Sequence, residues 1–204
     1  MLNLNHPEII RRPFKHHNMF YHFILNKTKL DYLCFTEEAI KLRRFLTETV
    51  AERKVPDHFF DIEGNPRCSS EPSINCFVDI VPNEWRKIIE EAIATKGDRE
   101  KHYVVLKALV ESSETNVVAC EIPVWTVGSG YYTGHVDCLS LNQKMPQIVV
   151  NDFKPRLTVG EDGGFGQLRM YKTLIAQLLE VAFDNIQCVL FDHIAKMIAP
   201  VSDV

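Results

Sequence analysis

The chain has 204 residues, of which 46% are hydrophobic and 25% are charged. These proportions are those of an ordinary globular protein, so they exclude a wholly disordered chain, a collagen-like repeat and a disulfide-rich mini-protein. The 23 Lys and Arg residues against 27 Asp and Glu residues give a net charge of −4. The net charge of the molecule therefore does not attract nucleic acid, and any binding to a polyanion must come from a local basic patch.

The first 30 residues differ from the rest, because they carry five Lys and Arg residues against the single acid Glu8. Such a segment is either a basic arm that contacts phosphate groups or a solvated or packed N-terminal segment. The apolar stretch 20–25 comes nearest to a signal-peptide core, but His22 interrupts it and no small-residue cleavage site follows. No apolar run approaches the roughly 18 residues of a membrane helix, so we expect no membrane partner.

The six cysteines include no Cys-x-x-Cys pair, so zinc or iron–sulfur ligation is poorly supported. Cys120 and Cys138 lie in apolar, strand-like runs, where cysteine usually behaves as a small buried hydrophobe. We therefore expect free thiols and a reducing intracellular compartment. The cytoplasm is the simplest choice, with a nuclear or virus-encoded protein as alternatives.

The sequence of residues 1–82 predicts a mainly helical or irregular extension that packs on the core or caps it. One helix is expected from about Glu37 to Lys54, because apolar residues recur there at helical spacing and Pro56 follows. The next stretch, to residue 83, contains three prolines among short apolar pieces. This composition predicts loops with one short strand at about 75–81.

From Asn83 the pattern becomes regular, and residues 83–204 predict the core. A helix capped by Asn83 and ended by Gly97 precedes a second helix from Asp98 to about Val110. Three strands with short links follow, then a helix and a last strand, at 116–125, 134–141, 147–153, 166–183 and 186–191. This order predicts an α/β fold with a central mixed sheet flanked by helices.

Two neighbouring expected strands carry acidic residues, and the second of them finishes in an acid and a base. Asp152 and Lys154 share a face, because alternate residues of a strand do so, and Asp137 lies on the strand before. If these strands pair, the two carboxylates meet at one end of the sheet beside the Lys154 ammonium. Two close carboxylates repel unless a cation joins them, and Mg²⁺ and Mn²⁺ prefer oxygen ligands. A metal held there activates water and stabilises charge on a phosphoryl oxygen, which describes a phosphodiesterase centre. The alternative is an ordinary ion pair between Asp137 and Lys154.

Three motifs carry a resemblance to a known family. Gly134-x-x-Asp137 followed by Asp152-x-Lys154 resembles motifs II and III of the PD-(D/E)xK nuclease superfamily. Downstream, Gln167-x-x-x-Tyr171 resembles the Gln-x-x-x-Tyr motif of its RecB-like exonuclease branch. The run that begins at Glu121, Glu-Ile-Pro-Val, is also similar to that branch. The resemblance covers residues 96–191, roughly half of the chain, and it implies a restriction-endonuclease-like core.

The resemblance implies a metal-binding role for particular residues. Asp137, Asp152 and the backbone carbonyl of Phe153 would hold Mg²⁺ or Mn²⁺, and Lys154 would assist the attacking water. Val136 stands where the family's name has Pro, and Asp152 stands where it has Glu. Both variants are similar to sequences of the RecB-like branch, so the expected chemistry is unchanged.

The family also places a metal-binding His or Glu on the helix before the sheet, where this chain has Glu100 and His102. We select His102, because it aligns with the expected apolar stripe of the helix. It resembles the branch's Gly-x-x-x-His motif, although four residues rather than three separate Gly97 from His102 here. The alternative is a core histidine that is satisfied by hydrogen bonds.

Gln167 and Tyr171 lie four residues apart and therefore share a helix face. The resemblance implies that they support the site and contact nucleic acid, while the alternative is a structural hydrogen bond between them. Arg169 projects from another face and is expected to meet phosphate groups or solvent.

The expected function is the hydrolysis of DNA phosphodiester bonds, in single-stranded or duplex DNA, by a metal-dependent deoxyribonuclease of the RecB-like exonuclease type. Two alternatives remain open. One is a structure-selective endonuclease of the same superfamily, and the other is a catalytically inert nucleic-acid-binding module. No helicase or nucleotide-binding motif accompanies the site. Such a small nuclease would act alone, as a homo-oligomer or with a partner protein.

Overall fold

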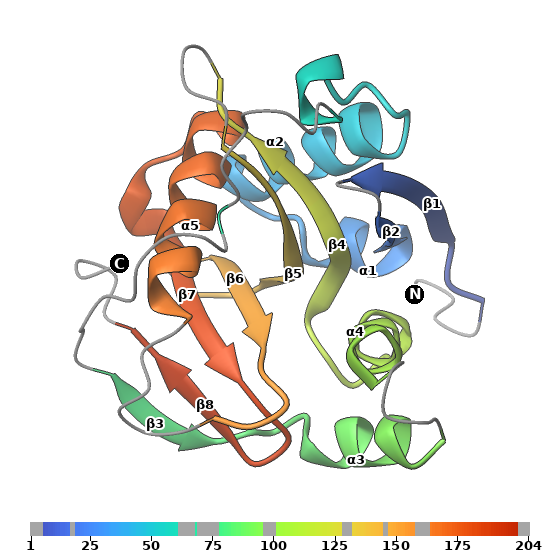
Figure 1. The fold of residues 1–204 in the computed structure, drawn as a ribbon, viewed down its shortest axis with the longest axis vertical. Helices are drawn as coiled ribbons and strands as arrows, with labels where there is room; N and C mark the ends of the chain where they lie inside the picture. The colour runs from blue at the N-terminus through green and yellow to red at the C-terminus, as the bar shows by residue number, and fades with distance from the viewer. Residues whose placement is uncertain are drawn as a thin grey trace.

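The computed structural model describes residues 6–16, 19–60, 68, 78–95, 101–127, 132–144, 147–157 and 164–199, which form one sheet with helices on both faces (Figure 1). The strands are β1 (Ile9–His16), β2 (Met19–Asn26), β3 (Asp79–Pro82), β4 (Val117–Trp125), β5 (Thr133–Leu141), β6 (Ile148–Phe153), β7 (Ile186–Phe191) and β8 (Ala195–Ile198). The α-helices are α1 (Lys27–Leu33), α2 (Glu37–Arg44), α3 (Arg86–Ala94), α4 (Lys101–Glu111) and α5 (Phe165–Leu179).

Within the described residues, the sheet has eight strands in the order β1-β2-β4-β5-β6-β7-β8-β3. Only β6 and β7 pair in parallel, and α5 connects them, whereas the other neighbours are antiparallel. A parallel pair needs such a crossover, because its strands run in the same direction. The expected α/β fold with a central mixed sheet is therefore confirmed.

The second half of the chain follows the expected order of two helices, three strands, a helix and a strand. Helix α5 ends at Leu179 rather than at about 183, because Glu180 takes a left-handed C-cap conformation. Strand β8 was not expected from the sequence. It follows β7 closely and pairs with it antiparallel. In the first half, the expected helix begins at Glu37 as α2 and continues as a π-helical segment, Phe45–Val50.

The prediction of a mainly helical or irregular region at residues 1–82 is wrong for its N-terminal part. Strands β1 and β2 form a hairpin, and β2 joins the sheet through the pairs Ile24↔Cys120 and Leu25↔Ala119 with β4. Pro13 lies within β1, although proline has no backbone N–H to donate to a neighbouring strand. Proline is tolerated in β1 because this strand forms an edge of the sheet, where one side needs no hydrogen-bond donors.

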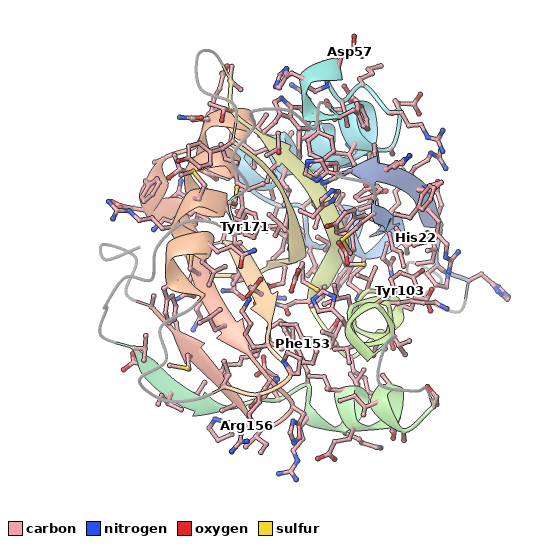
Figure 2. All side chains as sticks on the ribbon, in the orientation of Figure 1. His22, Asp57, Tyr103, Phe153, Arg156 and Tyr171 are labelled. Carbon is pink, nitrogen blue, oxygen red and sulfur yellow. The ribbon has the colours of Figure 1, made fainter. Side chains whose placement is uncertain are left out.

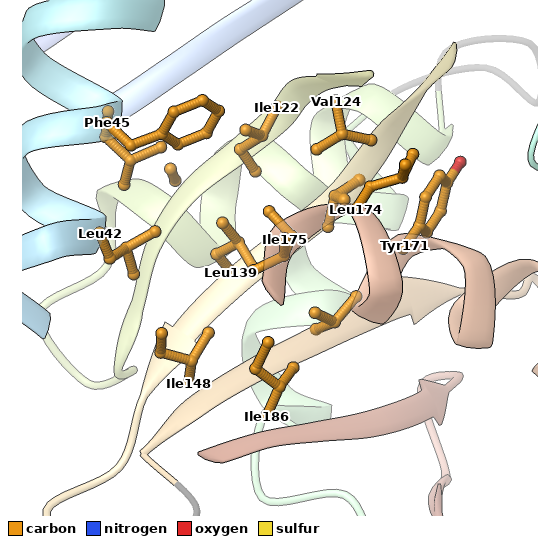
Figure 3. Close-up of a cluster of buried hydrophobic side chains, with 14 of the residues drawn as sticks. Leu42, Phe45, Ile122, Val124, Leu139, Ile148, Tyr171, Leu174, Ile175 and Ile186 are labelled. Carbon is orange, nitrogen blue, oxygen red and sulfur yellow. The ribbon is translucent and has the colours of Figure 1, made fainter. Parts of the chain in front are cut away.

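The hydrophobic core has two parts, one on each face of the sheet. On one face α2 and α5 pack over the strands, and Figure 3 shows Leu174 and Ile175 of α5 beside Leu139 of β5 and Ile148 of β6. On the other face α3 and α4 cover the strands through Ile89 and Leu106. The central strands β4, β5 and β6 are buried along their whole length. A polar side chain within them therefore needs a specific partner.

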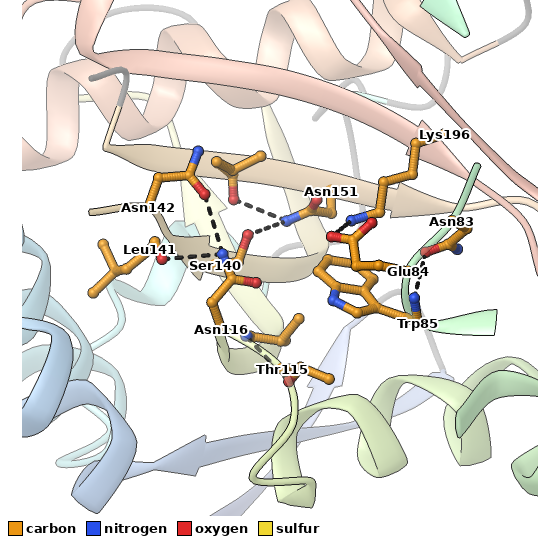
Figure 4. A network of polar contacts seen from close by, with 12 residues as sticks. Asn83, Glu84, Trp85, Thr115, Asn116, Ser140, Leu141, Asn142, Asn151 and Lys196 are labelled. Carbon is orange, nitrogen blue, oxygen red and sulfur yellow. Dashed lines mark hydrogen bonds and ion pairs between the residues drawn. The ribbon is translucent and has the colours of Figure 1, made fainter. Parts of the chain in front are cut away.

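Polar contacts also connect the helices to the sheet (Figure 4). Lys196 of β8 lies 2.6 Å from Glu84 and places its ammonium 3.3 Å from the centre of the Trp85 ring. The Asn83 side chain accepts a hydrogen bond from the backbone N–H of Trp85. These contacts attach the start of α3 to the β7–β8 end of the sheet. Within the part of the chain that the structure describes, no helix is long and apolar enough to cross a membrane.

Lys29 of α1 ties the N-terminal region to the core. Its side chain is buried, and Nζ donates to the carbonyl oxygens of Val110 and Val117 at 2.9 and 2.8 Å and to the Thr115 hydroxyl at 3.1 Å. We expect Lys29→Met to lower the free energy of unfolding by about 1–3 kcal/mol, because the carbonyls at the end of α4 lose their donor. Urea unfolding measures this change, and an exposed matched variant, Lys87→Met, is expected to stay within about 0.5 kcal/mol of the wild type.

Candidate active site

Strands β5 and β6 bring Asp137 and Asp152 to the same end of the sheet. Their ladder ends at the pair Cys138↔Asn151, so the two acids are the next facing residues and project to the same side. Asp137 Oδ2 accepts a hydrogen bond from the backbone N–H of Phe153 at 2.9 Å, and both carboxylates are buried. The expected pairing of these two strands is therefore present.

Lys154 lies beside the acids, and α5 holds it there. Its Nζ is 2.6 Å from Asp152 Oδ2 and 3.5 Å from Gln167 Oε1, while its backbone N–H donates to the Phe191 carbonyl of the parallel neighbour β7. Gln167 in turn donates through Nε2 to the Tyr171 hydroxyl at 2.7 Å. The structural hydrogen bond that was the alternative for Gln167 and Tyr171 is therefore present. It leaves Oε1 of Gln167 facing Lys154.

His102 reaches the acids from the opposite face, on α4. Its Nε2 lies 3.0 Å from Asp137 Oδ2, and its Nδ1 lies 3.7 Å from Glu121 Oε1. The ring is tilted against Phe153, with 5.8 Å between the ring centroids. The alternative helix-borne residue, Glu100, lies outside the described residues. Figure 2 labels Phe153 of β6, Tyr171 of α5 and Tyr103, which follows His102 on α4. These three side chains surround the site.

Glu121 belongs to this group, although the sequence analysis gave it no role. It is the only charged residue in β4, it is 7% exposed, and its φ of 52° is left-handed. This conformation is costly for a residue with a Cβ, and it interrupts the alternation of the strand. Cys120 packs with the α3–α4 layer and Ile122 with the α5 layer, although residues two apart normally share a face. A lone acid in an apolar strand was the signal that could have identified it.

The charge of Asp137 raises the affinity of Glu121 and of Asp152 for protons. Burial and the charge of Asp137 raise the pKa of Glu121 to about 8, against the opposing effect of His102. Burial and the charge of Asp137 likewise raise the pKa of Asp152, although Lys154 opposes the shift. For His102 burial alone would lower the pKa, but the hydrogen bond to Asp137 and the surrounding carboxylates raise it to about 9. The folded site therefore retains protons that an ordinary carboxylate and an ordinary imidazole would release near neutral pH.

The donor groups fit a hard divalent cation such as Mg²⁺ or Mn²⁺. Asp152 Oδ2 is buried and has the Lys154 ammonium at 2.6 Å, but no hydrogen bond of proper geometry satisfies it. An oxygen in this situation gains most from a cation. Across the described ranges, no three His, Cys, Asp or Glu side chains are arranged to hold a metal ion as they stand. In this arrangement His102 and Asp137 are hydrogen-bonded to each other, and the Lys154 ammonium lies against Asp152.

Glu121 of β4 and Asp137 of β5 line a cavity of about 490 Å³. Its lining also includes His102 from α4, Gln167 and Tyr171 from α5, and Met19 and Phe20 from the β1–β2 hairpin. The N-terminal region therefore supplies a wall of the candidate site. Arg169 is exposed on α5 and does not line this cavity, so the structure does not bring it to the other expected site residues.

No family model, no curated protein and no solved structure matches the chain. The interpretation of the site therefore rests on the chemistry and geometry of its own residues.

Gly134 shows why the motif on β5 begins with glycine. A Cβ at this position would lie 2.8 Å from Tyr171 Cε1 and 3.2 Å from Cys68 Sγ, both closer than ordinary contact. We expect Gly134→Ala to displace the Tyr171 ring and to lower the free energy of unfolding by about 1–3 kcal/mol. Thermal unfolding measures this cost, and the double variant with Tyr171→Leu is expected to recover part of it. Equal stability of Gly134→Ala and the wild type would contradict the close approach.

Proposed function

We propose that the protein is a divalent-metal-dependent nuclease that hydrolyses DNA phosphodiester bonds, with a restriction-endonuclease-like core of the RecB-like exonuclease type. One observation carries the proposal: the buried Asp152 carboxylate lies 2.6 Å from the Lys154 ammonium, at the end of a strand whose neighbour supplies Asp137. A structural ion pair gives no reason for a second buried acid, a third at Glu121 and a histidine in the same place.

Each residue has a chemical task in this proposal. Asp137, Asp152 and His102 are the residues that would hold Mg²⁺ or Mn²⁺, with the Phe153 carbonyl as a further oxygen. When bound, the metal supplies positive charge that activates a water molecule and stabilises the phosphoryl oxygens. Lys154 orients that water or stabilises the charge that develops on the phosphate, because its ammonium is a strong hydrogen-bond donor in a site with little solvent.

The supporting residues keep these groups in place. Gln167 faces Lys154 through Oε1, and Tyr171 fixes the orientation of Gln167 by accepting its Nε2 hydrogen bond. The Phe153 backbone N–H holds one oxygen of Asp137. Rate acceleration depends on such preorganised geometry, so the pair on α5 contributes to catalysis through Lys154.

A cleavage assay tests the proposal. The purified chain is incubated with end-labelled single-stranded DNA, duplex DNA and RNA, in Mg²⁺, in Mn²⁺ and in EDTA, and the Lys154→Met variant serves as the control for contaminating nucleases. We expect cleavage of DNA that requires metal and is absent from the variant. The product ladder then separates stepwise exonuclease action from internal cutting. Failure of the folded wild-type chain to cut DNA in either metal, together with failure to bind Mn²⁺ in calorimetry, would reject the proposal and leave a binding module.

A further inference from the structure

The part of the β1–β2 hairpin nearest the candidate active site exposes two apolar side chains. Phe20 is 69% exposed and Met19 is 55% exposed, yet both line the cavity that also contains His102, Glu121 and Asp137. Exposed large apolar groups cost solvation free energy, so a pair beside a polar cavity indicates a binding surface.

A basic residue stands next to this apolar pair. Lys15 of β1 is exposed and is the cross-strand partner of Phe20 in the antiparallel register. Directly opposed residues lie close enough for one ligand to contact both. An aromatic ring with an adjacent ammonium suits a ligand that has both a flat apolar group and a negative charge, and an unpaired nucleotide is such a ligand.

Aromatic side chains of the same hairpin stack on residues of the neighbouring elements. Tyr21 stacks on His135, with ring centroids 3.7 Å apart and an interplanar angle of 9°. His16 stacks on Phe59 at 4.3 Å, and its Nε2 lies 3.1 Å from the Thr133 hydroxyl. These contacts attach the hairpin to β5, the strand that carries Asp137. The stacking surface and the acids are therefore held in a fixed relation.

The size of the cavity limits what enters it. Its volume of about 490 Å³ lies within the range of pockets that enclose small molecules, so it accommodates nucleotide-sized groups and not the body of a duplex. A phosphate that reaches Asp137 through this opening must therefore belong to a strand whose bases near the site are unpaired.

We propose that the β1–β2 hairpin binds the unpaired end of a DNA strand, with a base stacked on Phe20 and a backbone phosphate at Lys15, and that single-stranded DNA is thus the preferred substrate. This inference rests on the proposed nuclease function, because it assigns the substrate class of the same site. Phe20 and Lys15 act as specificity-determining residues and take no part in the chemical step.

Binding without metal tests the hairpin separately from cleavage. Fluorescence anisotropy in EDTA measures the affinity of the wild type and of Phe20→Ala, Phe20→Trp and Phe35→Ala for a labelled oligothymidylate strand and for a duplex. Phe35 is the matched control, because it is 68% exposed and does not line the cavity. We expect Phe20→Ala to weaken single-strand binding by about tenfold, and we expect Phe20→Trp and Phe35→Ala to bind like the wild type. Lys15→Ala is expected to reduce the slope of log affinity against log salt by about 0.7.

The two proposals fail in different ways. If the wild type cuts DNA with metal but Phe20→Ala binds and cuts single strands as well as the wild type does, the hairpin inference is wrong and the nuclease function stands. If single-strand binding depends on Phe20 but no metal supports cleavage, the hairpin inference stands and the nuclease function is rejected. Tighter binding of the duplex than of the single strand would also overturn the inference.

Discussion

Replacement of Asp152 by Asn is expected to reduce metal-dependent cleavage by about 10²–10³-fold, the usual effect of removing one electrostatic contact to the reacting group. The fold is expected to remain intact and at least as stable near neutral pH. The reason is that burial and the neighbouring Asp137 charge raise the pKa of Asp152, so its ionised form is unfavourable in the folded protein. The amide has the same shape without the charge. Single-turnover cleavage and thermal unfolding measure the two effects.

Asp192 provides a matched control on the neighbouring strand. It follows β7, it is 5% exposed, and its side chain accepts hydrogen bonds from the backbone N–H groups of Leu157, Ile194 and Ala195. Although burial opposes the shift, these hydrogen bonds lower the pKa of Asp192. Asp192→Asn is therefore expected to cost about 1–3 kcal/mol of stability without abolishing cleavage by the folded protein. Loss of stability in Asp152→Asn comparable to that in Asp192→Asn would indicate that Asp152 is structural.

The contribution of Glu121 and His102 to the stability of the metal-free protein is expected to fall as the pH rises from about 4 to 9. Relative to the ordinary values of 4.5 and 6.5, the folded protein has a pKa of about 8 for Glu121 and about 9 for His102. The folded state therefore holds protons that the unfolded state has released. The stability that each of these two groups contributes is fully present below its pKa in the unfolded chain. It is lost as the pH rises through its pKa in the folded protein. Glu121 alone accounts for on the order of 5 kcal/mol, since its pKa rises from 4.5 to about 8 and one pKa unit corresponds to about 1.4 kcal/mol.

Equilibrium unfolding at a series of pH values measures this decline, and Glu121→Gln is expected to flatten it, because the amide does not ionise. Addition of Mg²⁺ or Mn²⁺ is expected to stabilise the protein more at pH 8 than at pH 5, since the cation replaces the protons. Removal of the metal with EDTA reverses the effect. Equal stabilisation at both pH values, or none at either, would contradict a cation site among these acids.

Part of the site follows from short stretches of sequence. Apolar, strand-like runs at 134–141 and 147–153, with a short link between them, predict two paired strands, and each strand carries an acid. The spacing of Gln167 and Tyr171 by four residues predicts a shared helix face, and the two side chains are hydrogen-bonded. These relations are local, because a strand period of two and a helix period of 3.6 are set by the backbone. The placement of His102 on the apolar stripe of its helix was correct for the same reason.

Other parts of the site depend on contacts between distant segments. Nothing near residues 9–26 indicates that they pair with β4, about 95 positions further along the chain, and Pro13 argues against a strand. The pairing becomes favourable only when the sheet exists and offers β4 as a partner, with the proline at an edge. The left-handed backbone at Glu121 likewise has no local signal, since its cost is met by the packing of Cys120 and Ile122 in opposite layers.

The sequence by itself therefore determined the two neighbouring strands that place Asp137, Asp152 and Lys154 and the helix face that carries Gln167, because periodicity and spacing are local properties. Only the tertiary structure decided that Glu121 joins His102 and that the first strands form a wall of the cavity. Those arrangements come from the burial of apolar surface between segments far apart in the chain. The free energy of that burial depends on the whole fold and is not encoded in any short stretch.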